Sequence, residues 1–64
     1  MLHFTNGNEE AIASYAIEAE RAGSWERVAS FVPGEGRYSL EAQGNATYRL
    51  VTERVDGTTA LIAF

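Results

Sequence analysis

The carboxylates with the best spacing for acid–base chemistry are those of Glu18 and Glu20. They stand two positions apart, a spacing that places both on one face of a β-strand. A carboxylate pair acts as general acid and base only where a cleft desolvates one member, and a chain of 64 residues offers little depth for a cleft. Arg27, Arg49 and Arg54 are candidate partners on neighbouring strands. We therefore interpret the two glutamates as part of a solvated cross-strand charge ladder, and assign no catalytic residue.

The other side chains with possible chemistry give no catalytic or metal-binding signature. The chain has one histidine, His3, and no cysteine, which excludes a thiolate or multi-histidine metal site. There is no Gly-x-Ser-x-Gly motif to build a triad with it. Asn6, Asn8, Glu9 and Glu10 offer oxygen ligands to calcium but lack the alternating Asp/Asn pattern of a dedicated loop. We expect no metal, no cofactor and no enzymatic activity.

The amino-acid composition limits which partners and which cellular locations are expected for the protein. The formal charge is −4 and the five basic residues, all arginine, are scattered. Nucleic acid and anionic membrane surfaces need clustered basic residues, so both are excluded as expected partners. The longest apolar run, residues 60–64, is too short for membrane insertion, and polar residues follow residues 2–4 too soon for a signal peptide. A chain without cysteine fits either the cytoplasm or a mature secreted protein.

Short segments with a period of two, separated by turn residues, run through most of the chain. The alternation covers residues 25–32, 38–43, 48–55 and 58–64. Regularly spaced short strands between Gly, Asn and Pro residues are typical of an all-β sandwich or barrel. Asp56-Gly57 gives the strongest hairpin signal and predicts a type I′ turn. We predict a single small domain, residues 1–64.

The segment NEEAIASYAIEAERAGSW, residues 8–25, is ambiguous by itself. Its alanines, the possible cap at Asn8 and the stop at Gly23 favour a helix over residues 9–22. The alternation of Tyr15, Ile17 and Ala19 with polar or small residues fits a strand instead. Both alternatives remain open on these residues alone.

Seven landmarks then follow one another along nearly the whole chain. They are Leu2-His3-Phe4-Thr5, Asn8-Glu9-Glu10, Tyr15-Ala16-Ile17-Glu18, Gly23-Ser24-Trp25-Glu26-Arg27-Val28-Ala29, Tyr38-Ser39-Leu40, Tyr48-Arg49-Leu50 and Val55-Asp56-Gly57. Their order resembles a fibronectin type III-like domain, in particular the version near the C-termini of large bacterial cell-surface and type IX-secreted proteins. The resemblance implies a small antiparallel fibronectin type III/immunoglobulin-like sandwich of about six strands, in which 15–21 is a strand. The alternative is an α+β fold with a helix at 9–22 on an antiparallel sheet.

The resemblance also leads to an expected core and an expected binding edge. The core is predicted to contain Phe4, Tyr15, Ile17, Trp25, Val28, Tyr38, Leu40, Tyr48, Leu50 and Ile62, with Trp25→Ala costing about 3–5 kcal/mol. The family's first strand has no counterpart here, so apolar surface would stay exposed to water. This exposure costs about 25 cal/mol of folding free energy per Å². We therefore expect association through a sheet edge. The predicted edge is the run Thr58, Thr59, Ala60, Leu61, Ile62, Ala63 and Phe64.

The function expected is that of a non-enzymatic binding or scaffolding module of a secreted or cell-surface protein. It would bind a protein partner, or a second copy of itself, by pairing strands at this edge. The alternative is a small cytoplasmic α+β accessory or inhibitor-like protein, possibly a homodimer, whose acidity suits a basic surface.

Overall fold

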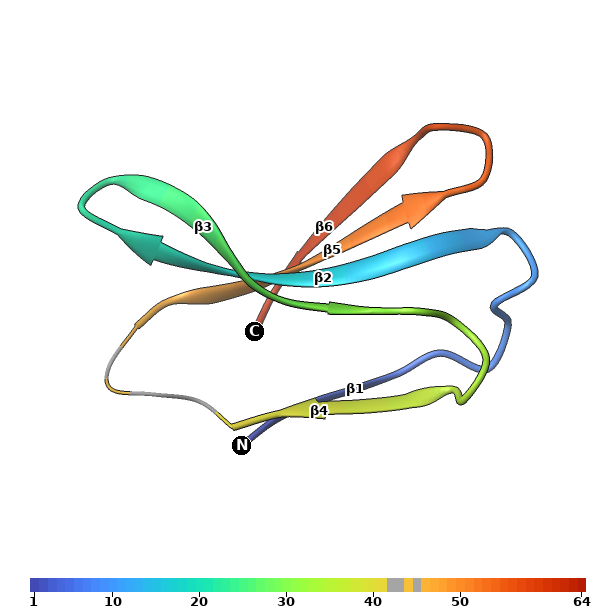
Figure 1. Cartoon of the computed structure of the whole chain (residues 1–64), viewed down its shortest axis with the longest axis horizontal. Helices are drawn as coiled ribbons and strands as arrows, with labels where there is room; N and C mark the ends of the chain where they lie inside the picture. Colours follow the sequence, from blue (N-terminus) through green and yellow to red (C-terminus); the bar gives the residue numbers. More distant parts are fainter. Residues whose placement is uncertain (42–43, 45) are drawn as a thin grey trace.

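Two antiparallel β-sheets packed face to face make up the fold (Figure 1). The computed structural model describes residues 1–41, 44 and 46–64. Its six strands are β1 (Leu2–Thr5), β2 (Ile12–Arg21), β3 (Ser24–Phe31), β4 (Arg37–Leu40), β5 (Tyr48–Arg54) and β6 (Thr59–Ala63). One sheet has the order β3-β2-β5-β6 and the other pairs β1 with β4. The all-β prediction is confirmed, although Ala42 and Gln43 of the predicted strand 38–43 lie outside the described residues. Within the described ranges no helix is long and apolar enough to cross a membrane.

The ambiguous segment is a strand, so the alternative helix over 9–22 is wrong. Strand β2 lies in the middle of the larger sheet, hydrogen-bonded to β3 on one side and β5 on the other. Tyr15, Ile17 and Ala19 point to one face and are buried there. The larger sheet and its facing layer thus bury more apolar surface than an alanine-rich helix stripe would. Tertiary context has overridden the local helix propensity.

The core lies between the two layers and is built largely from aromatic rings. Phe4, Tyr15, Phe31 and Tyr38 contact one another with ring centroids 4.8–5.7 Å apart. The buried core members are Tyr15, Ile17, Ala19, Tyr38, Tyr48 and Leu50. Most of the predicted core residues are therefore correct.

Three predicted core residues are not in the core, and two of them lie on β3. Ile17 pairs with Ala29, yet Glu18 pairs with Arg27, so Val28 is an extra residue in a β-bulge. Beyond a bulge, each side chain of the strand points to the face opposite to the one that strict alternation would give. The Trp25 side chain therefore shares the outer face of the sheet with Arg27 and is 36% exposed. The third, Ile62, lies on the edge strand β6 and is 56% exposed.

The two tight hairpins of the larger sheet use different turns. Ala22 and Gly23 join β2 to β3, both with positive φ (52° and 82°), as a type I′ turn requires. Between β5 and β6, the backbone N–H of Arg54 donates to the carbonyl of Thr58. Three residues therefore form that loop, and positive φ there is confined to Gly57 (90°). The hairpin at Asp56-Gly57 is confirmed, but its predicted type I′ geometry is wrong, because Asp56 does not have positive φ.

Candidate functional site: the open edge of the larger sheet

The outer face of the larger sheet carries an arginine that holds three strands together. Arg49 on β5 donates from Nε to Glu18 Oε1 on β2 at 2.8 Å, and its Nη2 lies 2.7 Å from the same oxygen. The Arg49 guanidinium also stacks on the Trp25 ring of β3, 4.2 Å from its centroid. The Glu18 carboxylate is thereby held in an ion pair, so Glu18 and Glu20 do not form a free carboxylate pair on β2.

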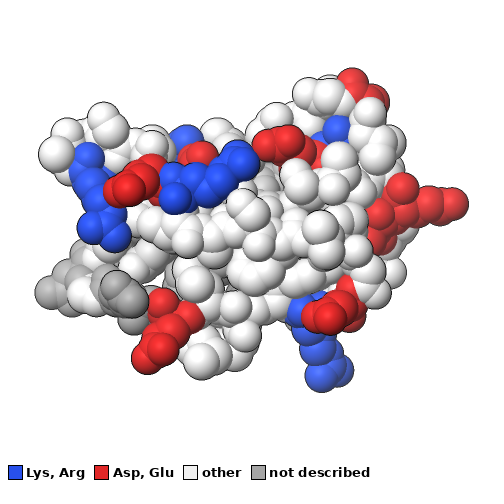
Figure 2. Space-filling view, viewed as in Figure 1, with Lys and Arg blue, Asp and Glu red and all other residues white. Residues whose placement is uncertain are grey.

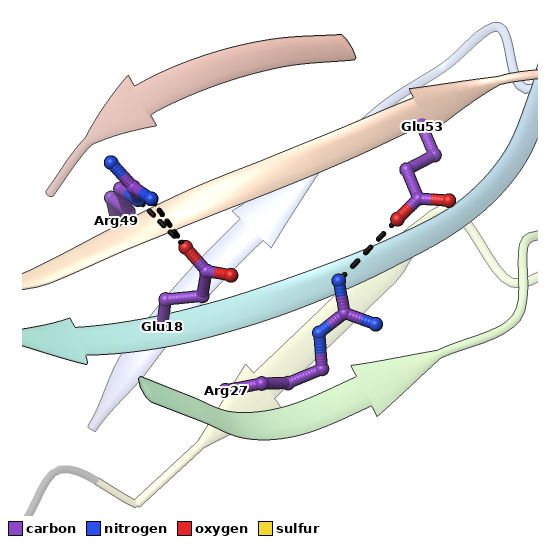
Figure 3. A network of polar contacts seen from close by, with 4 residues as sticks. All are labelled: Glu18, Arg27, Arg49 and Glu53. Carbon is purple, nitrogen blue, oxygen red and sulfur yellow. Dashed lines mark hydrogen bonds and ion pairs between the residues drawn. The ribbon is translucent and has the colours of Figure 1, made fainter. Parts of the chain in front are cut away.

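A second ion pair spans the same face (Figure 3). Arg27 on β3 donates from Nη2 to Glu53 Oε1 on β5 at 3.4 Å, and this contact crosses over β2. The residue between them in the pairing register is Ala16, which is only 3% exposed although it lies on the outer face. Because Ala16 has a short side chain, long side chains from both neighbouring strands can meet above it. Of the predicted charge ladder on Glu18 and Glu20, the structure shows the pair Glu18–Arg49. Arg27 pairs with Glu53, which was not predicted.

The remaining candidate side chains are dispersed. Glu20 is exposed opposite Trp25, and His3 is exposed on β1 opposite Ser39. Arg54 donates to Thr58 at the β5–β6 turn. Figure 2 shows arginines and carboxylates side by side on this view of the surface, with no large area of one sign.

The polar loop before β2 has a structural role that the sequence did not reveal. Both Tyr15 and Tyr38 donate their hydroxyl protons to Glu9 Oε2, at 2.7 and 2.5 Å. The backbone N–H of Gly34 donates to Glu9 Oε1 at 3.2 Å, and the Asn6 amide donates to the Tyr15 hydroxyl. Glu9 thus joins the two sheets and the 32–36 loop at one end of the sandwich. No group of three or more His, Cys, Asp or Glu residues that could hold a metal occurs in the part of the chain that the structure describes.

These hydrogen bonds change the pKa values of the three groups. The hydrogen bond from Tyr38, with those from Tyr15 and Gly34, lowers the pKa of the Glu9 carboxyl below its usual 4.5. Burial and the bond to Glu9 raise the pKa of Tyr15 to about 12 and also raise that of Tyr38. The carboxylate is therefore held as an anion by neutral donors, an arrangement that fits a structural role.

The hollows on the surface are shallow. One of about 160 Å³ is lined by Arg21, Val28, Leu40, Glu41 and Tyr48. Another of about 370 Å³ is lined by Ser14, Tyr15, Arg27, Ser30, Phe31 and Val32. Both are more open than a pocket that encloses a small ligand.

Residues 59–63 of the predicted edge 58–64 form β6, an edge strand of the larger sheet. Strand β6 pairs with β5 on one side only. Leu61 on the outer face and Ile62 on the inner face are 57% and 56% exposed, and Phe64 is 49% exposed. Residues 57–64 contain no charged side chain. Ile62 pairs with the core residue Leu50, so its exposure means that the two-stranded sheet does not cover β6.

The hydrogen-bond register of this edge follows from its two ends. Arg54 donates to Thr58, and Phe64 donates to Tyr48. Antiparallel ladders alternate between hydrogen-bonded and non-hydrogen-bonded pairs. Ala60 and Ile62 therefore direct their backbone groups to β5. Thr59, Leu61 and Ala63 direct theirs away from the sheet, toward the open edge.

No protein-family model matches the chain, and the searches of curated proteins and of solved structures found no match either.

Proposed function

We propose that the chain is a non-enzymatic binding or scaffolding module that takes an extended strand of a protein at the β6 edge. The observation that carries the proposal is the combination of free backbone groups at Thr59, Leu61 and Ala63 with exposed apolar side chains on both faces. Edges of this kind pair with other strands, and peptide recognition by strand addition uses main-chain hydrogen bonds for affinity and side-chain contacts for specificity.

The other edge of the larger sheet is protected in ways that β6 is not. Strand β3 carries the charged residues Glu26 and Arg27 and is interrupted by the bulge at Val28. Charges and bulges on an edge strand oppose pairing. Strands β1 and β4 have only four residues each. Among the described strands, β6 is the edge best suited to a partner.

The non-enzymatic part of the proposal is supported by how the carboxylates are used. Glu9 accepts hydrogen bonds from two tyrosines and one backbone N–H, and Glu18 is paired with Arg49. Glu53 is paired with Arg27. General acid–base catalysis needs a carboxylate that is desolvated and free to exchange a proton with a substrate.

A secreted or cell-surface location is proposed with this function. The resemblance of the sequence to fibronectin type III-like domains of bacterial cell-surface and type IX-secreted proteins supports it. The competing cytoplasmic accessory protein was expected to carry a helix on an antiparallel sheet, and that helix is absent from the described segment 9–22.

Amide chemical shifts test the proposed edge directly. The probe is a synthetic heptapeptide of alternating valine and threonine with a lysine tail, titrated into ¹⁵N-labelled protein at low micromolar concentration. We expect the largest shifts at the amides of Thr59, Leu61 and Ala63. The matched control peptide carries N-methyl groups on the edge that would face β6 and should cause no shifts. Equal responses to both peptides, or responses confined to other strands, would contradict strand addition at β6.

A further inference from the structure

We infer that the strand that pairs with β6 is the β6 strand of a second copy, antiparallel to the first and related to it by a two-fold axis through Leu61. This inference rests on the proposed function, because it names the partner of the same edge. A two-fold interface uses the same surface on both copies and must be self-complementary. The backbone, the side chains and the charges of this edge each meet that condition.

The backbone groups match when Leu61 faces Leu61 of the second copy. In that register, Thr59 of each copy faces Ala63 of the other. These are the three residues whose N–H and C=O groups point outward, so each facing pair exchanges two hydrogen bonds. A shift by one residue would place backbone groups that already bond to β5 opposite the outward-pointing groups of the second copy. The hydrogen bonds between the two copies would then be lost.

The side chains also match in this register. On the inner face, the small Ala60 stands opposite the large Ile62 of the second copy, and Ile62 opposite Ala60. On the outer face, Val51 and Leu61 share one row, and the two-fold axis extends it into an apolar row of four residues. Leu61 and Ile62 would each bury part of their exposed apolar surface against the second copy, which is favourable.

The charges beside the edge are arranged so that opposite signs share a row. Glu53 lies beside Thr59, and Arg49 lies beside Ala63. Facing Thr59 with Ala63 of the second copy therefore places Glu53 of one copy in the same row as Arg49 of the other, about 14 Å away across three strand spacings. Both side chains keep their partners within their own copy, and the row brings no like charges together. The net charge of −4 repels a second copy at long range, yet residues 57–64 carry no charge. A partner that binds through opposite charges would therefore find no charged side chain on β6 itself.

Cysteine crosslinking gives a register-specific test, because the chain has no cysteine of its own. In the two-fold pair, position 61 faces itself at a Cα separation of about 5.5 Å, within the range that a disulfide bridges. Position 59 of one copy and position 59 of the other would be roughly 14 Å apart, because they are offset by four residues along the paired strands. Under mild oxidation we expect Leu61→Cys to form a covalent dimer readily. Thr59→Cys alone and Ala63→Cys alone should form no disulfide-linked dimer, and their mixture should give the covalent heterodimer.

Sedimentation of the unmodified chain and of two edge variants completes the test. Leu61→Pro removes the leucine side chain and an outward N–H, a loss that an edge strand tolerates, and Leu61→Lys adds a charge that opposes pairing. The unmodified chain should dimerise between about 10 and 500 μM, and both variants should stay monomeric while keeping the wild-type circular dichroism spectrum. Crosslinking of Thr59→Cys as fast as that of Leu61→Cys, or a monomer at every concentration, would overturn the inference. The heptapeptide titration would then still decide separately whether β6 binds another strand.

Discussion

The guanidinium of Arg49 lies 4.2 Å from the centroid of the Trp25 ring, two strands away across the outer face of the larger sheet. Because Trp25 is an exposed partner of this cation and lies outside the core, we expect Trp25→Ala to cost about 1–2 kcal/mol instead of the 3–5 kcal/mol typical of a core tryptophan. A double-mutant cycle with Arg49→Ala, followed by urea unfolding, should give a coupling energy of about 0.5–1 kcal/mol. Trp25→Ala combined with Arg27→Ala is the matched control and should be additive. Additivity in both cycles would contradict a stabilising stack.

The Glu9 carboxylate should make the stability of the protein fall in acid. Its pKa is lowered in the folded state by the tyrosine donors, so its contribution is complete above the unfolded value of about 4.5 and is lost as the pH falls through the folded value. Urea unfolding between pH 2.5 and 6 should show a steeper decline for the wild type than for Glu9→Gln. Ser39→Ala, on the exposed face of β4, should keep the wild-type profile. An unchanged slope in Glu9→Gln would show that the carboxylate is not held as described.

The Tyr15 hydroxyl should have the opposite effect at high pH. Burial and Glu9 raise its pKa from 10.0 to about 12 in the folded state, so its contribution is complete below pH 10 and is lost as the pH rises toward 12. Tyr15→Phe should be less stable than the wild type at pH 8 but lose less stability between pH 10 and 12. Equilibrium unfolding at pH 8, 10 and 11 measures both effects. A parallel alkaline decline in the two proteins would contradict the raised pKa.

The β2–β3 turn holds a residue that is poorly suited to its backbone conformation. Ala22 has φ 52°, in the left-handed region, where a Cβ is unfavourable. Ala22→Asn gives the Asn-Gly pair that type I′ turns prefer, and should raise the free energy of unfolding by about 0.5–1 kcal/mol. Ala11→Gly is a control at an exposed turn position without positive φ and should give no gain. Thermal unfolding measures the difference, and a loss of stability in Ala22→Asn would contradict the assigned turn.

Ile17 and Ile62, both on the inner face of the larger sheet, should respond very differently to truncation. Ile17 is fully buried in the middle of the sheet, whereas Ile62 on β6 is more than half exposed. Ile17→Ala should cost about 2–5 kcal/mol, a large fraction of the roughly 3–10 kcal/mol available to a domain of this size. Ile62→Ala should cost less than about 1 kcal/mol when measured on the monomer at low concentration. Comparable losses in the two variants would mean that Ile62 is covered.

Most of the fold could be predicted from the period-two pattern and the order of turns. The strand over Tyr15, Ile17 and Ala19 could not be decided locally, because the burial that stabilises it comes from β5 and the facing sheet. The bulge at Val28 could not be predicted either, since it leaves no mark on the alternation and shows itself only in the pairing with β2. It is the reason that Trp25 lies outside the predicted core.

The candidate site was predictable in part. The charge-free run 58–64 indicated an edge from the sequence, because apolar residues continue to its last position without a protecting charge. The role of Glu9 was missed, since its two tyrosine partners are distant in sequence and a lone glutamate in a polar loop gives no signal. The crossing pair Arg27–Glu53 was missed for a similar reason. It depends on Ala16 being small at the strand between them, which only the register reveals.

The topology of the two sheets also sets the order in which they assemble. In Figure 1, β2 with β3 and β5 with β6 form hairpins between neighbouring segments. Two pairings join distant segments instead: β1 with β4, with Leu2 opposite Leu40, and β2 with β5, with Ile12 opposite Arg54. Closing a long loop costs more entropy than closing a tight turn, and such distant contacts slow folding. The two hairpins should therefore form first, and the pairings β2–β5 and β1–β4 later. Until both have formed, the aromatic core is incomplete and exposed, so refolding yield should fall as protein concentration rises.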